Sequence, residues 1–328
     1  MVIAVDAVGG DHFPQIPVAG AIRALEENPE LEILLVGPKE LIESELQKHN
    51  DHRERIDILH APEIIGMDDS PSVAVKSKQN SSIALGLAAH KDNKCDAFVS
   101  AGNTGALLAA STFLLGKLPG VTRPTIAATY PTLKGISLLV DAGANLELKP
   151  EMYLQFAKMC TIFAREIMGI DTPTVGLLNV GEEPEKGLDI HKEVYKLLSG
   201  LDNFSGNVEG KDIFLGKTDI YLTDGFTGNL ILKFGESIPS TLQTLTAQVM
   251  EEEKMVASER EIVQQVLSKA MHSFDYENVG GIPFLGVNGL SLVGHGGSSE
   301  KALKNMIVNA LQCKEHKINE KIVASLNN

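Results

Sequence analysis

The chain has 328 residues, a length that predicts one large or two ordinary domains. With 43% hydrophobic and 22% charged residues, its composition is typical of a globular protein and excludes a disordered or fibrous chain. A net charge of −14 without a long cluster of lysine and arginine argues against binding to the phosphate backbone of nucleic acids.

Short runs rich in β-branched residues alternate with segments of helical period along most of the chain. The predicted strands span residues 2–5, 31–36, 56–59, 97–99, 125–128, 136–140, 175–180, 220–223 and 290–293. Between many of them lie segments, such as 18–25 and 153–167, whose apolar residues recur three and four positions apart, as they do in a helix. This βαβ pattern predicts an α/β fold, a three-layer αβα unit in which helices cover both faces of a mainly parallel sheet. Since no linker or repeat divides the chain, we expect residues 1–328 to form a single domain.

The stretch from about Glu236 to Phe274 contains no strand-like run. Two helical stripes of apolar residues flank the segment EEEKMVAS at 251–258: Ile238, Leu242, Leu245 and Val249 before it, and Ile262, Val266 and Ala270 after it. This pattern is consistent with a helical hairpin, residues 236–274, that projects from the sheet, with Pro239 at the start or at a kink of its first helix. It is equally consistent with two ordinary covering helices.

The cysteines and the N-terminus indicate the compartment. Cys95, Cys160 and Cys313 lie far apart and form no Cys-x-x-Cys pair, which argues against a disulfide framework and a structural zinc site. The first seven residues are typical of a strand and lack the basic region of a signal peptide. No apolar run approaches the roughly 18 residues of a membrane-spanning helix. We therefore expect a cytoplasmic protein.

Glycine and small polar residues follow six of the predicted strands. Ligands of open α/β sheets bind beyond the carboxyl ends of strands, so these six loops predict a site at one edge of the sheet. Glycine lets the backbone approach a ligand, and the N–H groups that open a helix attract anions, so a phosphate or an acyl oxyanion is the expected ligand. Each loop alone is also explained by a tight turn or a helix cap. The candidate ligand-binding residues are Asp6, Gly9, Gly10, Asn103, Thr104, Asp141, Asn145, Asp224, Gly225, Thr227, Gly228 and Ser298.

The common nucleotide and hydrolase motifs are missing from the sequence. No Gly-x-Gly-x-x-Gly follows the first strand, and the string Gly216-Lys217-Thr218 does not complete a P-loop because Lys211 stands where its first glycine belongs. There is no Gly-x-Ser-x-Gly elbow and no His-Glu-x-x-His zinc pair. A kinase, a dehydrogenase and a conventional hydrolase are therefore all disfavoured.

Three basic side chains are candidates for ligand contact. His12 and His295 lie in glycine-rich loops, which favours a ligand contact over a place in the core. Lys186 follows several glutamates, which is typical of a solvated charge, but it also stands beside Gly187 after a strand, where it can reach a phosphate. The strand-end aspartates can cap loops, orient a base or bind a divalent ion, and loop capping is the commoner role.

Seven strings in this sequence closely resemble the phosphate acyltransferase family of bacterial phospholipid synthesis. They are AVDAVGGDH at 4–12, MDDSPSVAVKSKQNSS at 67–82, FVSAGNTGALLAA at 98–110, LVDAGAN at 139–145, LLNVGEE at 177–183, TDGFTGN at 223–229 and GHGGSS at 294–299. The resemblance implies a fold related to those of phosphotransacetylases and isopropylmalate dehydrogenases. It also implies a peripheral membrane enzyme, generally a homodimer, that converts acyl-acyl carrier protein and inorganic phosphate to acyl phosphate and free carrier protein. A membrane acyltransferase that acts on glycerol 3-phosphate then uses the product.

The implied reaction makes phosphate the nucleophile, so no serine or cysteine elbow is needed. Attack on a thioester requires positioning and charge neutralisation above all. We expect Lys186 and Asn229 to supply them, with His12 and His295 as unranked alternatives that stabilise the oxyanion or the departing thiolate. Leu188 and Asp189 depart from the Lys-Gly-Asn-Glu string that is frequent in the family. No organic cofactor or metal is implied, although the aspartates leave a divalent ion open.

Two alternative functions are consistent with the same sequence features. A phosphotransacetylase-like enzyme that uses acyl-coenzyme A has the same crevice, and a non-catalytic lipid-synthesis scaffold has the same loops.

Met255, Val256 and Ala257 form an apolar triplet at the expected tip of the hairpin. We expect this tip to insert weakly into a membrane surface, and a contact between subunits is the alternative.

Overall fold

The computed structural model describes residues 1–49, 52–271 and 280–327. Its strands are β1 (Val2–Asp6), β2 (Glu32–Gly37), β3 (Ile56–His60), β4 (Ala97–Ser100), β5 (Thr125–Thr132), β6 (Gly135–Val140), β7 (Val175–Leu178), β8 (Phe204–Val208), β9 (Ile220–Leu222), β10 (Gly281–Leu285) and β11 (Ser291–Gly294). Within these residues, the eleven strands form one sheet in the order β3-β2-β1-β4-β11-β10-β5-β6-β9-β7-β8. All nine predicted strands are present, and β8 and β10 were not predicted.

Helices cover both faces of this sheet. They are α1 (Gln15–Glu27), α2 (Lys39–Leu46), α3 (Pro71–Ser77), α4 (Ser82–Lys91), α5 (Thr104–Leu114), α6 (Pro150–Glu166), α7 (Asp189–Leu198), α8 (Gly210–Leu215), α9 (Gly225–Glu252), α10 (Ala257–Met271), α11 (Glu300–Glu315) and α12 (Ile318–Leu326), with a 3-10 turn at Arg53–Arg55. Alternate residues of a strand point to opposite faces, so Val5 packs in the core under α1 and α11, while Ala4 packs in the core under α4 and α5. The predicted three-layer αβα architecture is confirmed.

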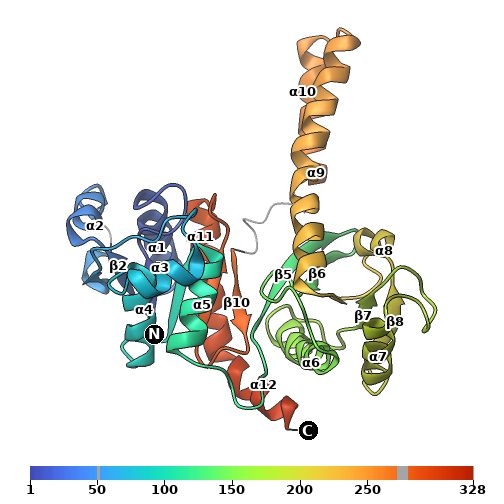
Figure 1. Cartoon of the computed structure of the whole chain (residues 1–328). Coiled ribbons are helices and arrows are strands. Elements are labelled where there is room, and N and C mark those ends of the chain that lie inside the picture. The colour runs from blue at the N-terminus through green and yellow to red at the C-terminus, as the bar shows by residue number, and fades with distance from the viewer. Residues whose placement is uncertain (50–51, 272–279, 328) are drawn as a thin grey trace.

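The strands of the sheet form two parallel blocks that run in opposite directions. In the described residues, seven of the ten strand pairings are parallel, as predicted for a mainly parallel sheet. The three antiparallel pairings, β11 with β10, β10 with β5 and β5 with β6, follow one another across the middle. The block β6, β7, β8 and β9 therefore runs opposite to the block β1, β2, β3, β4 and β11. Figure 1 shows these blocks in two lobes, with β2 of the first block on the left and β6, β7 and β8 of the second block on the right.

This reversal corrects the expectation that all six polar loops meet at one edge of the sheet. The loops after β1, β4 and β11 lie at one edge, whereas those after β6, β7 and β9 leave from the other. The two sets of loops nevertheless lie close together along β10. Gly281 pairs with Gly294 at the end of β11, and Phe284 pairs with Ile126, which accepts from the N–H of Ala142 just after β6. Three residues of β10, about 10 Å of extended chain, thus separate the two sets of loops along the sheet.

The helices α9 and α10 form a hairpin that stands away from the sheet (Figure 1). The first helix begins at Gly225, earlier than the predicted Glu236, because the carboxylate of Asp224 caps it. Pro239 lies inside α9 and does not start it. The end of the predicted excursion, Phe274, lies outside the described residues. The structure therefore favours the projecting hairpin over two covering helices.

The apolar stripes of the hairpin face solvent in this single chain. Leu245 and Val249 of α9 are 51% and 54% exposed, and Ile262 and Val266 of α10 are 62% and 63% exposed. Among the described residues, no helix, α9 included, combines the length and the apolar character that are needed to cross a membrane.

Candidate active site

The loops after β1 and β4 are joined by the buried carboxylate of Asp6. Ser100 Oγ donates to Asp6 Oδ2 at 2.6 Å and accepts from the N–H of Gly102 at 3.0 Å. The N–H of Val8 donates to Asp6 Oδ1 at 3.2 Å. Burial raises the pKa of Asp6, and its hydrogen bond from Ser100 acts in the opposite direction. A Cβ on Gly9 would lie 2.8 Å from Asp6 Oδ2, so this predicted ligand residue is a glycine because the two loops are pressed together.

The loop after β11 adjoins the loop after β1. The N–H of Asp11 donates to the carbonyl oxygen of Gly296 at 2.9 Å, and Gly10 has a φ of +94°, a conformation that favours glycine. In the β11 loop, Ser298 Oγ donates to the carbonyl oxygen of His295 at 2.5 Å, and the N–H of Gly297 donates to His295 Nδ1 at 3.1 Å. Because Nδ1 accepts a hydrogen bond, the proton of the neutral ring is on Nε2, which makes Nε2 a donor.

Asn103 and Thr104, at the start of α5, lie in different surroundings. Asn103 caps the helix by accepting from the N–H of Ala106 at 3.0 Å, and its Nδ2 donates to carbonyl oxygens in the segment 66–69. Asn103 is buried and holds this segment in place, whereas Thr104, the first residue of α5, is exposed.

In the second lobe, Asp141 organises the loop after β6. Its Oδ2 accepts from the backbone N–H and from Nδ2 of Asn145, both at 2.7 Å, and its Oδ1 accepts from the N–H of Ala144 at 3.0 Å. Burial raises the pKa of Asp141, and these hydrogen bonds oppose the rise. The carbonyl oxygen of Asn145 in turn accepts from the N–H of Gly225 at 2.8 Å, which joins this loop to α9.

Asp224 and Thr227 form the N-terminal cap of α9. Asp224 Oδ1 accepts from the N–H of Thr227 at 2.8 Å, and Asp224 Oδ2 accepts from Thr227 Oγ1 at 2.9 Å. Asp6, Asp141 and Asp224, which are predicted ligand-binding residues, thus all accept hydrogen bonds within their own loops, and Asp6 also accepts from Ser100 at the end of β4. Loop capping, the commoner role for such aspartates, describes what the structure shows.

A cavity of about 520 Å³ brings the two sets of loops together. From the first lobe, Thr104 and His295 line it; from the second, Gly143 and Asn229 do. Ile126 and other residues of β5 lie between them, so the cavity crosses the middle strands of the sheet. A Cβ on Gly143 would lie 3.4 Å from Cβ of Asn229, which shows how closely the β6 loop approaches α9. The candidate active site is therefore a cleft between the lobes.

Lys233 lies in this cleft and was not predicted from the sequence. Asn229, Lys233 and Glu236 lie four and seven positions apart on one face of α9, and all three line the cavity. Lys233 Nζ forms an ion pair with Glu236 Oε2 at 2.8 Å. The spacing of Lys233 one helical turn after Asn229 was the available signal, but a lysine and a glutamate three residues apart resemble an ordinary surface pair.

Two of the four predicted catalytic residues lie elsewhere. All four are exposed, but Asn229 and His295 line the cleft, whereas Lys186 and His12 lie outside this lining as far as the structure describes it. Lys186 belongs to the loop between β7 and α7, where its carbonyl oxygen accepts from Asn179 Nδ2 at 3.0 Å. The catalytic roles of Lys186 and His12 stay predictions.

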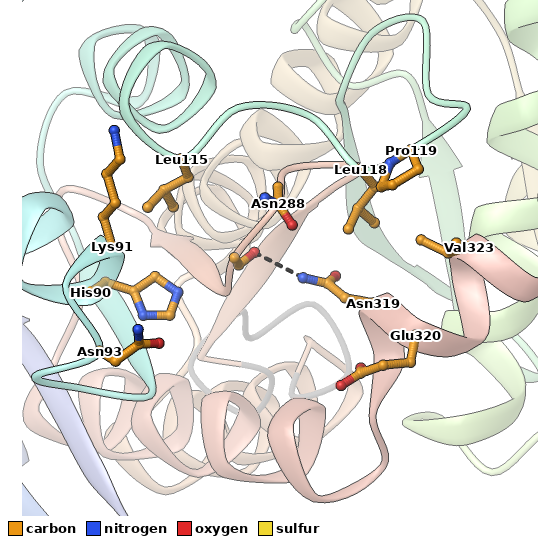
Figure 2. Close-up of a pocket in the computed structure, with 11 residues that line it drawn as sticks. His90, Lys91, Asn93, Leu115, Leu118, Pro119, Asn288, Asn319, Glu320 and Val323 are labelled. Carbon is orange, nitrogen blue, oxygen red and sulfur yellow. Dashed lines mark hydrogen bonds between the residues drawn. The ribbon is translucent and has the colours of Figure 1, made fainter.

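A separate cavity, of about 670 Å³, lies at the amino end of β11, away from the glycine-rich loops. Figure 2 shows His90 on one side of this cavity and Asn319 of α12 on the other, where Asn319 Nδ2 donates to the carbonyl oxygen of Gly289 at 3.2 Å. His90 Nε2 accepts from the N–H of Leu290 at 2.9 Å, so Nδ1 carries the proton and donates to the carbonyl oxygen of Cys95 at 3.0 Å. Both ring nitrogens of His90 thus bind the backbone, which gives this histidine a structural role.

The chemistry of the cleft suits an anion. Lys233, which is paired with Glu236, supplies a cation, and His295 and the amide of Asn229 supply donors. The backbone of the loop 294–297 and the carboxylate of Asp11 line the same space. Among the described residues, no group of three His, Cys, Asp or Glu side chains is placed to hold a metal ion. The arrangement can hold a phosphate and stabilise negative charge that develops on a reacting carbonyl oxygen.

Solved structures of two acyl-transferring enzymes share this fold. A phosphotransacetylase from Streptococcus pyogenes superposes with a TM-score of 0.61 at 15% identity, covering 96% of this chain and 94% of that one. A branched-chain phosphotransacylase from Enterococcus faecalis superposes with a TM-score of 0.59 at 12% identity, covering 96% and 99%. The expected relation to the phosphotransacetylase fold is confirmed.

Sequence comparison identifies the family. The model of a family described as "Fatty acid synthesis protein" matches residues 1–321. A phosphate acyltransferase of Salinibacter ruber is 50% identical over 312 residues, which cover 94% of this chain and 92% of the relative. A phosphate acyltransferase of Chlorobaculum parvum is 48% identical, with 99% of both chains covered. These full-length matches show that the chain is an acyltransferase and belongs to the phosphate acyltransferase family.

Proposed function

We propose that this phosphate acyltransferase takes its acyl group from acyl-acyl carrier protein and transfers it to inorganic phosphate. A phosphate oxygen attacks the thioester carbonyl, the carbonyl oxygen becomes an oxyanion, and the carbon–sulfur bond then breaks. Acyl phosphate and the thiol of the free carrier protein are the products. The observation that carries this proposal is the convergence of Asn229, Lys233 and His295 on one cleft between the lobes.

Each of these side chains has a role in the proposed reaction. Lys233 and the amide of Asn229 hold the phosphate, because a charged donor and a neutral donor on one helix face can contact two of its oxygens. His295 lines the same cavity, and its ring donates to the oxyanion or to the departing thiolate sulfur. Phosphate itself is the nucleophile, so the three cysteines, all buried, have no part in the reaction.

The reaction is tested with purified protein, palmitoyl-carrier protein and phosphate. We expect thiol release that depends on phosphate and needs no nucleotide, with acyl phosphate trapped as the hydroxamate. Palmitoyl-coenzyme A at the same concentration is the comparison donor. A higher kcat/KM with the coenzyme A thioester would support the phosphotransacetylase-like alternative. Absence of turnover with both donors would leave the scaffold alternative.

We infer that the enzyme works as a homodimer in the cytoplasm, against the surface of the membrane. The exposed stripes of α9 and α10, which include Leu245 and Ile262, offer an apolar surface to a second copy of the chain. At the hairpin tip, Val256 is 60% exposed beside Met255 and Ala257. Such a position suits delivery of an apolar acyl phosphate to a membrane acyltransferase that acts on glycerol 3-phosphate. Sedimentation equilibrium of the wild type and of Leu245→Asp tests the dimer, which the aspartate should dissociate.

A further inference from the structure

Three cavities adjoin one another along α5. Leu108 lines the reaction cleft and also a second cavity of about 520 Å³. Ala109 and Phe113 line this second cavity and also a third, of about 580 Å³. Thr104, Leu108 and Phe113 follow one another along the helix, and the nine steps from Thr104 to Phe113 span about 14 Å. Shared lining residues therefore link the three cavities, from the reaction cleft to the far end of α5, and we call this series of cavities the path along α5.

The third cavity is the apolar end of this path. It lies between α3, α4 and α5, where Val75, Leu85 and Ala88 line it together with Leu114. The second cavity is more polar, with Lys117 and Arg123 in its lining. The third cavity is the most apolar of the three, although Lys76 and Gln79 also line it, and the reaction cleft holds the anion donors.

Phe113 stands where the second and third cavities meet, and it is 81% exposed. Together with the apolar lining of the third cavity, this exposed ring forms an apolar patch, and such patches are typical of surfaces that bind a ligand or a protein. The acyl chain of the thioester is the apolar part of the proposed substrate, and its carbonyl carbon must lie in the reaction cleft. The path along α5 begins at that point.

We propose that the acyl chain lies along α5, from the reaction cleft past Leu108 and Ala109 into the third cavity beside Phe113, and that this groove sets the acyl-chain length. The inference rests on the proposed function and adds the binding site for the lipid part of the substrate. Each methylene group that the groove buries favours binding by about fourfold. Long acyl chains that reach the third cavity therefore bind better than short chains that end near Leu108.

Ala109→Phe tests the groove, because the larger side chain blocks the passage between the second and third cavities. We expect kcat/KM for palmitoyl-carrier protein to fall at least tenfold, while kcat/KM for octanoyl-carrier protein and the KM for phosphate stay within twofold. Ala324→Phe, on the exposed side of α12, is the matched control and should alter neither. An equal fall for both acyl chains in a folded Ala109→Phe protein, or no fall, would overturn the proposal.

A second variant measures substrate binding independently of turnover. The sequence has no tryptophan, so Phe113→Trp gives a single emitter at the junction of the two cavities. We expect palmitoyl-carrier protein to shift its emission to the blue and the free carrier protein to leave it unchanged. If the wild type releases no thiol, the proposed function fails, whereas an unchanged emission with active enzyme refutes only the groove. Dissociation of a dimer by Phe113→Trp would show that a second copy covers this surface, which would also refute the groove.

Discussion

Gly228 packs directly against the backbone carbonyl of Asp141, with no room for a Cβ atom between them. This contact places the first turn of α9 against the end of β6, so Asn229 and Lys233 project from α9 into the cleft. The position of both side chains therefore depends on a residue without a side chain.

Gly228→Ala should displace the start of α9. Overpacking of this kind costs about 1–3 kcal/mol in the free energy of unfolding, and the shift of Asn229 should also lower kcat. Urea unfolding and steady-state kinetics measure the two effects. Gly210→Ala is the control, because a Cβ on Gly210 at the start of α8 meets no atom within 4 Å. Equal stabilities for the two variants would contradict the proposed packing constraint.

Much of the fold was readable from the sequence because buried parallel strands are apolar runs. The strands β8 and β10 were missed because Ser205, Gly206 and Asn207 interrupt the first and Pro283 the second. The direction of each strand was not readable. The antiparallel strands in the middle reverse the second block, so the polar loops do not share one edge as expected.

The candidate site was also predictable only in part, because its residues come together only through the packing of the two lobes. Glycine-rich loops are visible in any sequence, and Asn229 and His295 were found through them. Lys233 was not, because only the packing of α9 over the cleft distinguishes it from a solvated lysine paired with Glu236. Lys186 resembled a phosphate ligand in its loop, yet the fold leaves it exposed outside the cleft.

Lys233→Met should remove the cation that holds phosphate. We expect kcat/KM for phosphate to fall about a hundredfold, and Asn229→Ala to cause a similar loss, as when a donor to the transition state is removed. Lys233→Arg keeps the charge and should recover part of the activity. Normal kinetics in both Lys233→Met and Asn229→Ala would remove α9 from the reaction.

Lys186→Ala, which the sequence predicts to lose about a hundredfold in turnover, decides between two positions for the cation. A loss equal to that of Lys233→Met would show that the β7 loop reaches the substrate. Unchanged turnover would make Lys186 a solvated charge.

No thiol of this chain should react while the protein is folded. Burial raises the pKa of Cys95 and of Cys313 to about 12 and also raises the pKa of Cys160. A buried thiol that stays protonated is neither a nucleophile nor a target for thiol reagents. We expect no modification of the native enzyme at pH 8 and three modified thiols after unfolding. A folded variant with all three cysteines changed to alanine should keep its turnover, and its inactivity would argue for an acyl-cysteine intermediate.

His90 should make the stability of the protein sensitive to acid. Burial lowers the pKa of His90 below its ordinary value of 6.5, so the unfolded chain takes up a proton more readily than the folded one. Stability is therefore complete above about pH 6.5 and decreases as the pH falls from there toward the lowered pKa. Urea midpoints at pH 7.5, 6.5 and 5.5 should fall more steeply for the wild type than for His90→Asn. His12→Asn, at an exposed position, should keep the slope of the wild type.

The hairpin tip should attach the enzyme weakly to a lipid surface. Val256 is exposed, while Met255 is half-buried and its carbonyl oxygen accepts from Arg260 Nε at 2.9 Å. Burial of a Met or Val side chain in lipid contributes about 1.5–3 kcal/mol, whereas the exposed Glu251, Glu252 and Glu253 are repelled by anionic headgroups. Binding should therefore be reversible and only slightly dependent on salt.

Sedimentation with liposomes measures this attachment. Met255→Asp combined with Val256→Asp should abolish it, with dimer mass and activity in solution unchanged. Ser258→Asp is the control, because it adds a negative charge in the first turn of α10 without removing an apolar side chain, and it should weaken sedimentation only slightly. Because the tip is also apolar enough to contact another subunit, the mass of the double variant is decisive. A fall to the monomer mass would assign Met255 and Val256 to the dimer contact and exclude their role at the membrane.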